Sequence, residues 1–322
     1  MIVYNAAMDA VAGLLDGPRA RGAFLLRSLL DPPWSLRIQD EAPLTVVAVM
    51  RGEASVLLDG GEAVRLRRGA VAIIRGPEHY TVADDPATEP QVVIHPGQRC
   101  TTVEGEELVQ MRELGVRTWG NSPDGATVLL TGTYQLDGEV SQRLLRALPT
   151  LLVLSEHDWS SPIIPLLADE IVKDEPGQEA VLDRLLDLLL IAVLRAWFAR
   201  PEGEAPGWYR AYADPVVGRA LRMLHNNPAR RWTVAALADA TGVSRAGLAR
   251  RFNELVGEPP MTFLTGWRIA LAADLLREPG ATLGSVAYQV GYGSPFALST
   301  AFKRVRGISP QQHRMVHAPA EP

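Results

Sequence analysis

Three side chains in the first third of the sequence have the chemistry to bind a metal ion or to respond to an oxidant. His79 and His95 each end a strand-like run, and Cys100 lies five residues beyond His95. Two imidazoles and a thiolate suit Zn²⁺ or another divalent metal, although such a set is one ligand short of a structural zinc site. Cys100 is also a candidate redox switch, because the cation of Arg99 beside it would lower its pKa. The alternatives are hydrogen-bonded histidines and an inert thiol.

A second group of residues has the chemistry to bind a polyanion. Residues 1–211 contain 19 Lys and Arg against 30 Asp and Glu, whereas residues 212–317 contain 13 against 6. The net charge of −5 over 322 residues therefore hides a basic C-terminal region. Solvated basic faces are common, so this charge indicates a nucleic-acid partner only if a motif positions it.

The basic region contains one motif twice. Thr233–Gly242 (TVAALADATG) matches Thr282–Gly291 (TLGSVAYQVG) at an offset of 49, and five further pairs match at an offset of 50. These pairs are Ser244/Ser294, Leu248/Leu298, Phe252/Phe302, Gly257/Gly307 and Pro260/Pro310. The pattern predicts a Thr-capped helix, a glycine turn, and a Ser-capped second helix that ends at a glycine. It is typical of a helix-turn-helix, whose second helix enters the major groove of DNA.

A helical stretch, Thr262–Glu278, joins the two units and would set their second helices about 34 Å, one DNA turn, apart. Over residues 212–316 the sequence resembles the DNA-binding domain of AraC/XylS-type transcription regulators. The residues that carry this resemblance, besides the repeat, are Gly257, Pro259, Pro260, Trp267, Arg268, Tyr292, Ala301, Ser309, Pro310 and Arg314.

The resemblance implies which side chains meet DNA. They are Ser244, Arg245, Ala246, Ala249, Arg250 and Arg251 in the first unit, and Ser294, Pro295, Phe296, Thr300, Lys303, Arg304 and Arg306 in the second. Arg250 is the expected base reader, because arginine can bond O6 and N7 of guanine together. The other arginines and Lys303 are expected to contact phosphates. Thr300 stands where the family often has Arg, so with Pro295 and Phe296 it is expected to read DNA shape or thymine methyl groups.

The sequence before the basic region is of a different class. From Phe24 to Tyr134 short β-rich runs alternate with Gly, Pro and Asp turns, which predicts a small barrel or sandwich. From Val140 the apolar period becomes helical, most clearly over 179–200. The pattern Gly69…Gly76-Pro77-x-His79 is similar to a second cupin motif and implies a cupin-type effector domain, although Val46–Arg51 lacks the His-x-His and Glu ligands of the first motif.

We therefore predict an α+β protein: a cupin-like β-barrel with a helical extension, followed by an all-α domain with two helix-turn-helix units. The expected boundaries are 1–139 for the barrel, 140–200 for a helical dimerisation or packing segment, 201–211 for a linker and 212–316 for the DNA-binding domain. The broad apolar face of 179–200 fits a homodimer contact or packing onto the barrel equally well.

The favoured function is a sequence-specific DNA-binding transcription regulator, more an activator than a repressor by resemblance. Expected partners are double-stranded promoter or operator DNA, RNA polymerase, and a small-molecule or oxidant effector. Trp34, Tyr80, Trp119 and Tyr134 are candidates to line an effector pocket, or core residues. A cupin metalloenzyme (dioxygenase or isomerase) fused to a DNA-binding domain is the alternative, and a purely architectural DNA-binding protein is a third interpretation.

The expected location is the cytoplasm. The longest apolar run in the leucine-rich region is Leu188–Leu194, far below the roughly 20 residues of a membrane span. The start MIVYNAAMDA lacks the basic and apolar parts of a secretory signal, and a single cysteine fits a reducing compartment.

Overall fold

The computed structural model describes residues 24–108, 112–134, 138–146, 148–159, 161–200 and 207–316. The described chain divides into two compact units. The barrel unit contains residues 24–134 and 145–200, and the helical unit contains residues 138–144 and 207–316. Among the described residues, no helix is long and apolar enough to cross a membrane.

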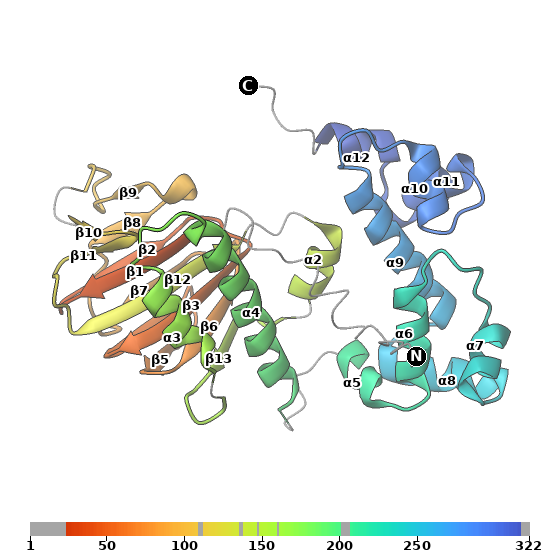
Figure 1. The fold of residues 1–322 in the computed structure, drawn as a ribbon, viewed down its shortest axis with the longest axis horizontal. Helices are drawn as coiled ribbons and strands as arrows, with labels where there is room; N and C mark the ends of the chain where they lie inside the picture. The colour runs from red at the N-terminus through yellow and green to blue at the C-terminus, as the bar shows by residue number, and fades with distance from the viewer. Residues whose placement is uncertain are drawn as a thin grey trace. The chain divides into compact units, whose positions relative to one another are not determined.

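The described strands of the barrel unit form two sheets (Figure 1). The strand order is β10-β11-β1-β12-β3-β6-β13 in one sheet and β5-β4-β7-β2-β8-β9 in the other. Their bounds are β1 Phe24–Leu30, β2 Ser35–Ile38, β3 Leu44–Arg51, β4 Glu53–Leu58, β5 Ala63–Arg67, β6 Val71–Arg75, β7 Tyr80–Ala83, β8 Val92–Ile94, β9 Cys100–Thr101, β10 Arg112–Gly115, β11 Thr118–Gly120, β12 Thr127–Tyr134 and β13 Leu151–Leu154. A short 3-10 helix, η1 (Pro96–Gln98), lies between β8 and β9.

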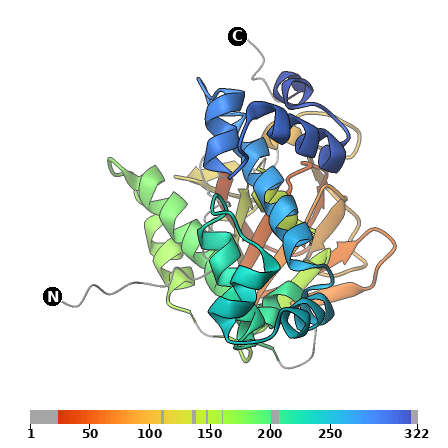
Figure 2. The same ribbon diagram turned by 90° about the vertical axis from the view of Figure 1, so that its right-hand side faces the viewer.

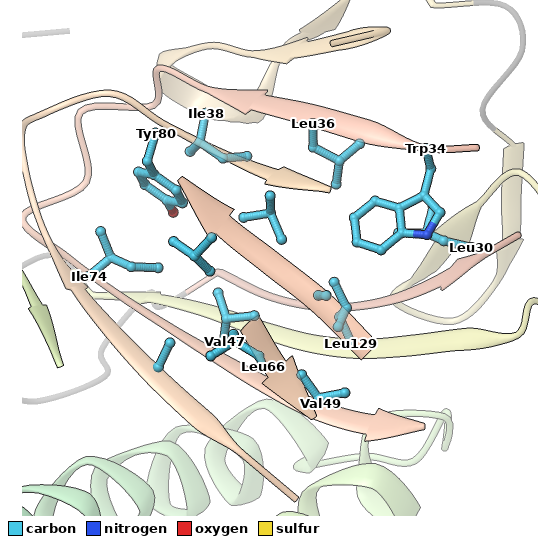
Figure 3. Packing of buried hydrophobic residues seen from close by; sticks show 14 of the residues in the cluster. Leu30, Trp34, Leu36, Ile38, Val47, Val49, Leu66, Ile74, Tyr80 and Leu129 are labelled. Atoms are coloured by element: carbon cyan, nitrogen blue, oxygen red, sulfur yellow. The ribbon is translucent and has the colours of Figure 1, made fainter. Parts of the chain in front are cut away.

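The core of the barrel unit lies between these sheets. Val47 and Val49 of β3 and Leu129 of β12 point from one sheet towards Leu36 of β2 and Tyr80 of β7 in the other (Figure 3). Because side chains alternate along a strand, each sheet gives one apolar face to this layer. Burying each large side chain there contributes about 1.5–3 kcal/mol relative to leaving it in water. The two sheets and this shared layer confirm the predicted small barrel or sandwich.

Helix α4 (Gln178–Phe198) packs on the seven-stranded sheet, the one that contains β12 and β13. At Gly132 of β12 an added Cβ would lie 2.8 Å from Cδ2 of Leu186, so the missing side chain admits the helix. The buried hydroxyl of Tyr134 donates a hydrogen bond to the Leu186 carbonyl at 2.8 Å. Packing onto the barrel therefore accounts for the broad apolar face of α4. On the outer side of α4, Val181 and Leu188 remain 45% and 51% exposed. Helix α3 (Ile163–Glu170) lies beside α4.

Two expectations about the connecting regions are wrong. The segment expected to be helical from Val140 contains strand β13, which pairs antiparallel with β6 from Leu151 opposite Ile74. A short unbroken apolar run such as LLVL does not distinguish a strand from a helix, so periodicity could not find it. The expected linker 201–211 is helical from residue 207, where α5 (Gly207–Ala213) begins and packs on the first helix-turn-helix unit. Residues 201–206 lie outside the described residues.

The helical unit is built around one long helix, α9 (Pro260–Leu275), which runs between two smaller clusters of helices (Figures 1 and 2). One apolar core forms around Leu248, Phe252 and Phe263, and another around Val286, Leu298 and Phe302. The remaining helices are α2 Glu139–Leu145, α6 Val217–Asn226, α7 Val234–Thr241, α8 Arg245–Val256, α10 Leu283–Gln289, α11 Pro295–Arg306 and α12 Pro310–Val316. The joining helix predicted over Thr262–Glu278 is thus present, shifted two to three residues towards the N-terminus.

Candidate nucleic-acid interface

The first helix-turn-helix unit forms at the predicted residues. Oγ1 of Thr233 accepts a hydrogen bond from the Ala236 amide at 3.0 Å and begins α7. Gly242 ends that helix with φ of 74°, a backbone conformation that a side chain would strain. Oγ of Ser244 then accepts from the Gly247 amide at 3.1 Å and begins α8. The Ser244 oxygen is therefore engaged in capping.

The second unit repeats this geometry. Thr282 and Ser285 form a reciprocal capping box at the start of α10. Gly291 makes the turn with φ of 86°, and Ser294 caps α11 by accepting from the Ala297 amide at 3.2 Å. In both units the paired Leu and Phe face inwards, since Leu248, Phe252, Leu298 and Phe302 are fully buried.

The outward face of α8 presents a single long cation among small side chains. Residues 246, 249, 250 and 253 fall on one side of the helix, opposite the buried Leu248 and Phe252. Ala246 is exposed and Ala249 is half-buried, so neither blocks an approaching groove. The Arg250 side chain is 78% exposed, and its Nε lies 3.7 Å from an Oε of Glu254 in a solvent-screened pair. It is thus free to extend towards a base edge.

The outward face of α11 has a different character. Phe296 is 79% exposed and follows Pro295 in the first turn. Thr300 is exposed at the position that matches Arg250, and Lys303 lies one further turn along the same side. This face offers a ring, a methyl group and one cation, which fits contact with thymine methyl groups and with the backbone more closely than guanine recognition. Arg304 in the last turn of α11, and Arg245 at the start of α8, are also exposed.

Arg251 is already engaged within the protein. Its Nε and Nη2 donate to Oδ2 of Asp214 at 2.9 and 2.5 Å. Oδ1 of Asp214 accepts from the amides of Val216 and Val217, at 3.0 and 2.9 Å, and caps α6. Burial raises the pKa of Asp214, but the Val217 amide and the Arg251 guanidinium outweigh it and hold this pKa below its ordinary value. Asp214 therefore ties α6 to α8, a role that sequence reasoning missed.

Arg306 is engaged as well. Both of its terminal nitrogens contact the carboxylate of Glu139, the first residue of α2. Asp274 of α9 accepts from the amides of Glu139 and Val140, at 2.6 and 3.1 Å, and so caps α2. The buried Val140 packs against Trp267. A short helix that lies between β12 and β13 in the sequence thus belongs to the helical unit up to residue 144.

The structure does not assemble the predicted metal set. His79 precedes β7 and His95 follows β8, and strand β2 runs between β7 and β8, so two strand spacings, about 10 Å, separate their backbones. Nε2 of His95 lies 2.9 Å from Oγ1 of Thr101. Among the described residues, no three His, Cys, Asp or Glu side chains are grouped so as to hold a metal ion. His79, His95 and Cys100 therefore do not form a metal site with other residues in the part of the chain that the structure describes.

Cys100 is a half-buried free thiol. Burial raises its pKa, which is the opposite of the shift expected from Arg99. Its Sγ lies 3.6 Å from the Gln98 carbonyl oxygen. Because the thiolate is the reactive form, this environment does not activate the cysteine.

The barrel unit encloses a small apolar cavity of about 40 Å³ between its two sheets. Tyr80 and Trp119, two of the four aromatic residues singled out in the sequence, line it. Trp34 is instead part of the surrounding core, and Tyr134 faces α4. The lining is Phe24, Leu26, Ser28, Leu36, Ile38, Asp40, Val47, Tyr80, Val82, Ile94, Gln98, Trp119, Leu129, Thr131 and Thr133. Asp40 is the one carboxylate among them, and Nε2 of Gln98 lies 3.5 Å from its Oδ2.

Two helix-turn-helix units on one joining helix, each with a solvent-facing second helix, define a DNA-binding protein. Comparison with known proteins agrees: a cupin family model matches residues 9–199, and a helix-turn-helix domain model matches residues 237–315. An AraC-like transcription regulator of Streptomyces lividans is 35% identical over 312 residues, covering 95% of this chain and 98% of the relative. A second, from Streptomyces antibioticus, is 33% identical over 315 residues with the same coverages.

The HTH-type transcriptional regulator AlkR of Acinetobacter baylyi is 25% identical over 313 residues, which cover 95% of this chain and 99% of that protein. The chain belongs to the AraC-like transcription regulators, and its N-terminal part is a cupin domain. The resemblance expected from the doubled motif is confirmed.

Proposed function

We propose that this AraC-like regulator is controlled by a small organic effector that enters the cavity of the barrel unit. The observation that carries the proposal is the lining, which is mostly apolar and includes the carboxylate of Asp40, 3.5 Å from Nε2 of Gln98. Such a lining suits a compact, mostly apolar molecule with one hydrogen-bond donor for the Asp40 carboxylate.

The size of the cavity supports a mechanism of control. A volume of about 40 Å³ is far below the roughly 300 Å³ or more of an ordinary ligand pocket. A ligand must therefore push the sheets apart, and it will favour whichever conformation of the barrel accepts it. The burial and raised pKa of Cys100 favour this organic effector over an oxidant.

Helix α2 is our candidate for carrying the signal to the DNA-binding region. The division between the two units falls inside this helix, because Leu145 belongs to the barrel unit, where its carbonyl accepts from Nη1 of Arg75 at 3.5 Å. Its other end is capped by Asp274 and paired with Arg306. The chain passes from the helical unit to the barrel unit inside this seven-residue helix, so a change at Leu145 can reach α11 along the backbone and through the Glu139–Arg306 pair.

The regulator acts on promoter DNA in the cytoplasm, recruits RNA polymerase and activates more than it represses. A second copy of the chain pairs through the exposed stripe of α4 that contains Val181 and Leu188. The cupin domain acts as a sensor and not as an enzyme. Relatives named as transcription regulators support this assignment.

A ligand screen on the full-length protein tests effector control. Compounds that raise the melting temperature of the protein are then added to an operator-binding assay. A true effector should change the affinity of the protein for operator DNA by about 5- to 150-fold. Thr131→Phe places a ring in the cavity and should abolish both effects. Val103→Phe, which adds a ring at a 58% exposed position of the barrel unit outside the cavity lining, is the matched control and should keep both the thermal shift and the change in operator affinity. Hits that bind Thr131→Phe as tightly as the wild type would contradict the proposal.

A further inference from the structure

Arg268 of α9 is half-buried, and its guanidinium points into the protein and not towards solvent. Nε donates to the carbonyl of Pro228 at 2.7 Å, and Nη2 donates to the carbonyl of Arg230 at 2.8 Å. Both carbonyls belong to the loop between α6 and α7, directly before the Thr233 cap of the first helix-turn-helix unit. A planar fork matches two carbonyls in a way that the single ammonium of lysine does not.

The same guanidinium also meets the second helix-turn-helix unit. Its Cζ lies 5.8 Å from the ring centroid of Tyr292, which follows the turn glycine of that unit. At Gly291 an added Cβ would lie 2.7 Å from Cα of Ala229 and 2.8 Å from Nη2 of Arg268. The α6–α7 loop of the first unit therefore touches the turn of the second unit, and Arg268 lies at the point of contact.

This contact is a second link between the two helix-turn-helix units. Helix α9, about 24 Å long for its 16 residues, is the covalent link and sets their separation. Each helix-turn-helix unit also packs on its own part of α9, through Phe263 in the first core and Ile269 in the second, so the freedom that remains is for a unit to roll on the surface of that helix. A second, non-covalent bridge removes much of that freedom, so that fewer relative orientations remain to be lost on binding DNA.

The loop itself is held firmly enough to serve as an anchor. The Arg230 guanidinium lies over the Trp232 ring, 4.3 Å from its centroid. The indole Nε1–H of Trp232 donates to the Asn227 carbonyl at 2.9 Å, which closes the loop on itself. Movement of the first unit against the second must therefore break the Arg268 contacts.

We propose that Arg268 is a positioning residue that fixes the separation and rotation of α8 and α11, the second helices of the two helix-turn-helix units. It thereby sets which spacing of operator half-sites the regulator accepts. It reads no base and neutralises no phosphate. The inference rests on both α8 and α11 engaging DNA in one complex.

Operators whose two half-sites are moved apart or together test this inference. Full-length wild-type protein and the Arg268→Lys variant are titrated with duplexes in which the centre-to-centre distance, about 10 base pairs at its optimum, is changed by one or two base pairs. Wild type should prefer one spacing. Arg268→Lys keeps the charge and loses the fork, so the ratio of affinities between the best and shifted spacings should fall by about 5-fold or more. The salt dependence of binding should not change.

Arg219→Lys, at an exposed arginine of α6, is the control and should keep the wild-type spacing preference. Tyr292→Leu, which removes the ring beside Arg268, gives a second variant if Arg268→Lys melts too early to assay. A variant that weakens binding by the same factor at every spacing would overturn the proposal, because that pattern is a general loss of stability. Wild-type binding with no spacing preference would also overturn it, while leaving DNA binding itself established.

Discussion

Replacing Arg250 by Ala should remove recognition of one base pair and leave the free protein almost unchanged. In the free protein this side chain is 78% exposed, and its contact is a 3.7 Å pair with Glu254 one turn along α8. An exposed pair of this kind contributes about 0.3–0.5 kcal/mol, so the melting temperature should move little. In the complex a bidentate bond to guanine contributes about 1–3 kcal/mol, which corresponds to roughly 5- to 150-fold in affinity.

The assay is a titration of labelled duplexes in which the base pair opposite Arg250 is changed to each of the other three. Wild type should lose affinity on every change, whereas Arg250→Ala should bind all four duplexes with similar, weak affinity. Arg245→Ala is the matched control, because this exposed arginine at the start of the same helix is expected to contact phosphate. The Arg245→Ala variant should bind all four duplexes more weakly than the wild type, by the same factor for each. An Arg250→Ala variant that still discriminates among the four base pairs would refute the assignment.

Four further changes probe other parts of the molecule. Lys303→Ala should weaken all sequences alike and flatten the slope of log affinity against log salt by about 0.9, and an unchanged slope would exclude a phosphate contact. Phe252→Ala empties a fully buried site and should lower the free energy of unfolding by about 3–5 kcal/mol in urea titrations; a loss below 1 kcal/mol would contradict the packing. The pKa of Asp214 is lowered in the folded state. Its contribution is therefore complete above the ordinary aspartate pKa, near 3.9, and is lost as pH falls through the folded value, so Asp214→Asn should flatten the acid limb of the stability profile. Glu139→Gln should release Arg306 and tighten operator binding severalfold, whereas weaker binding would mean that the pair supports the DNA-bound form.

The parts of the fold that could be predicted are those in which local chemistry decides the structure. The repeat places Thr233, Ser244 and their partners at helix starts, and capping is a contact between residues three apart, so the sequence contains all of it. The glycine turns are predictable for the same reason, since only the backbone at that residue is involved. The strand runs of the barrel were recognisable from turn residues and β-branched patterns.

What could not be predicted depends on residues that are far apart in the sequence. Glu139 and Arg306 are 167 positions apart, and nothing in either neighbourhood indicates that they meet. Asp214 could have been recognised as a helix cap, but its contact with Arg251 follows only from the packing of α6 on α8. The pKa of Cys100 depends on burial by the fold, which outweighs the neighbouring cation that the sequence displays.

Both helix-turn-helix units of the joining helix α9 are expected to bind DNA together. Selection of full-length protein on random duplexes, followed by hydroxyl-radical footprinting of the enriched site, tests it most directly. We expect one enriched sequence with two protected segments on the same face of the DNA, about 10 base pairs apart. The Arg250→Ala variant should lose the sequence preference at one base pair, in only one of the two protected segments. No enriched sequence, or protection confined to a single segment, would contradict the claim.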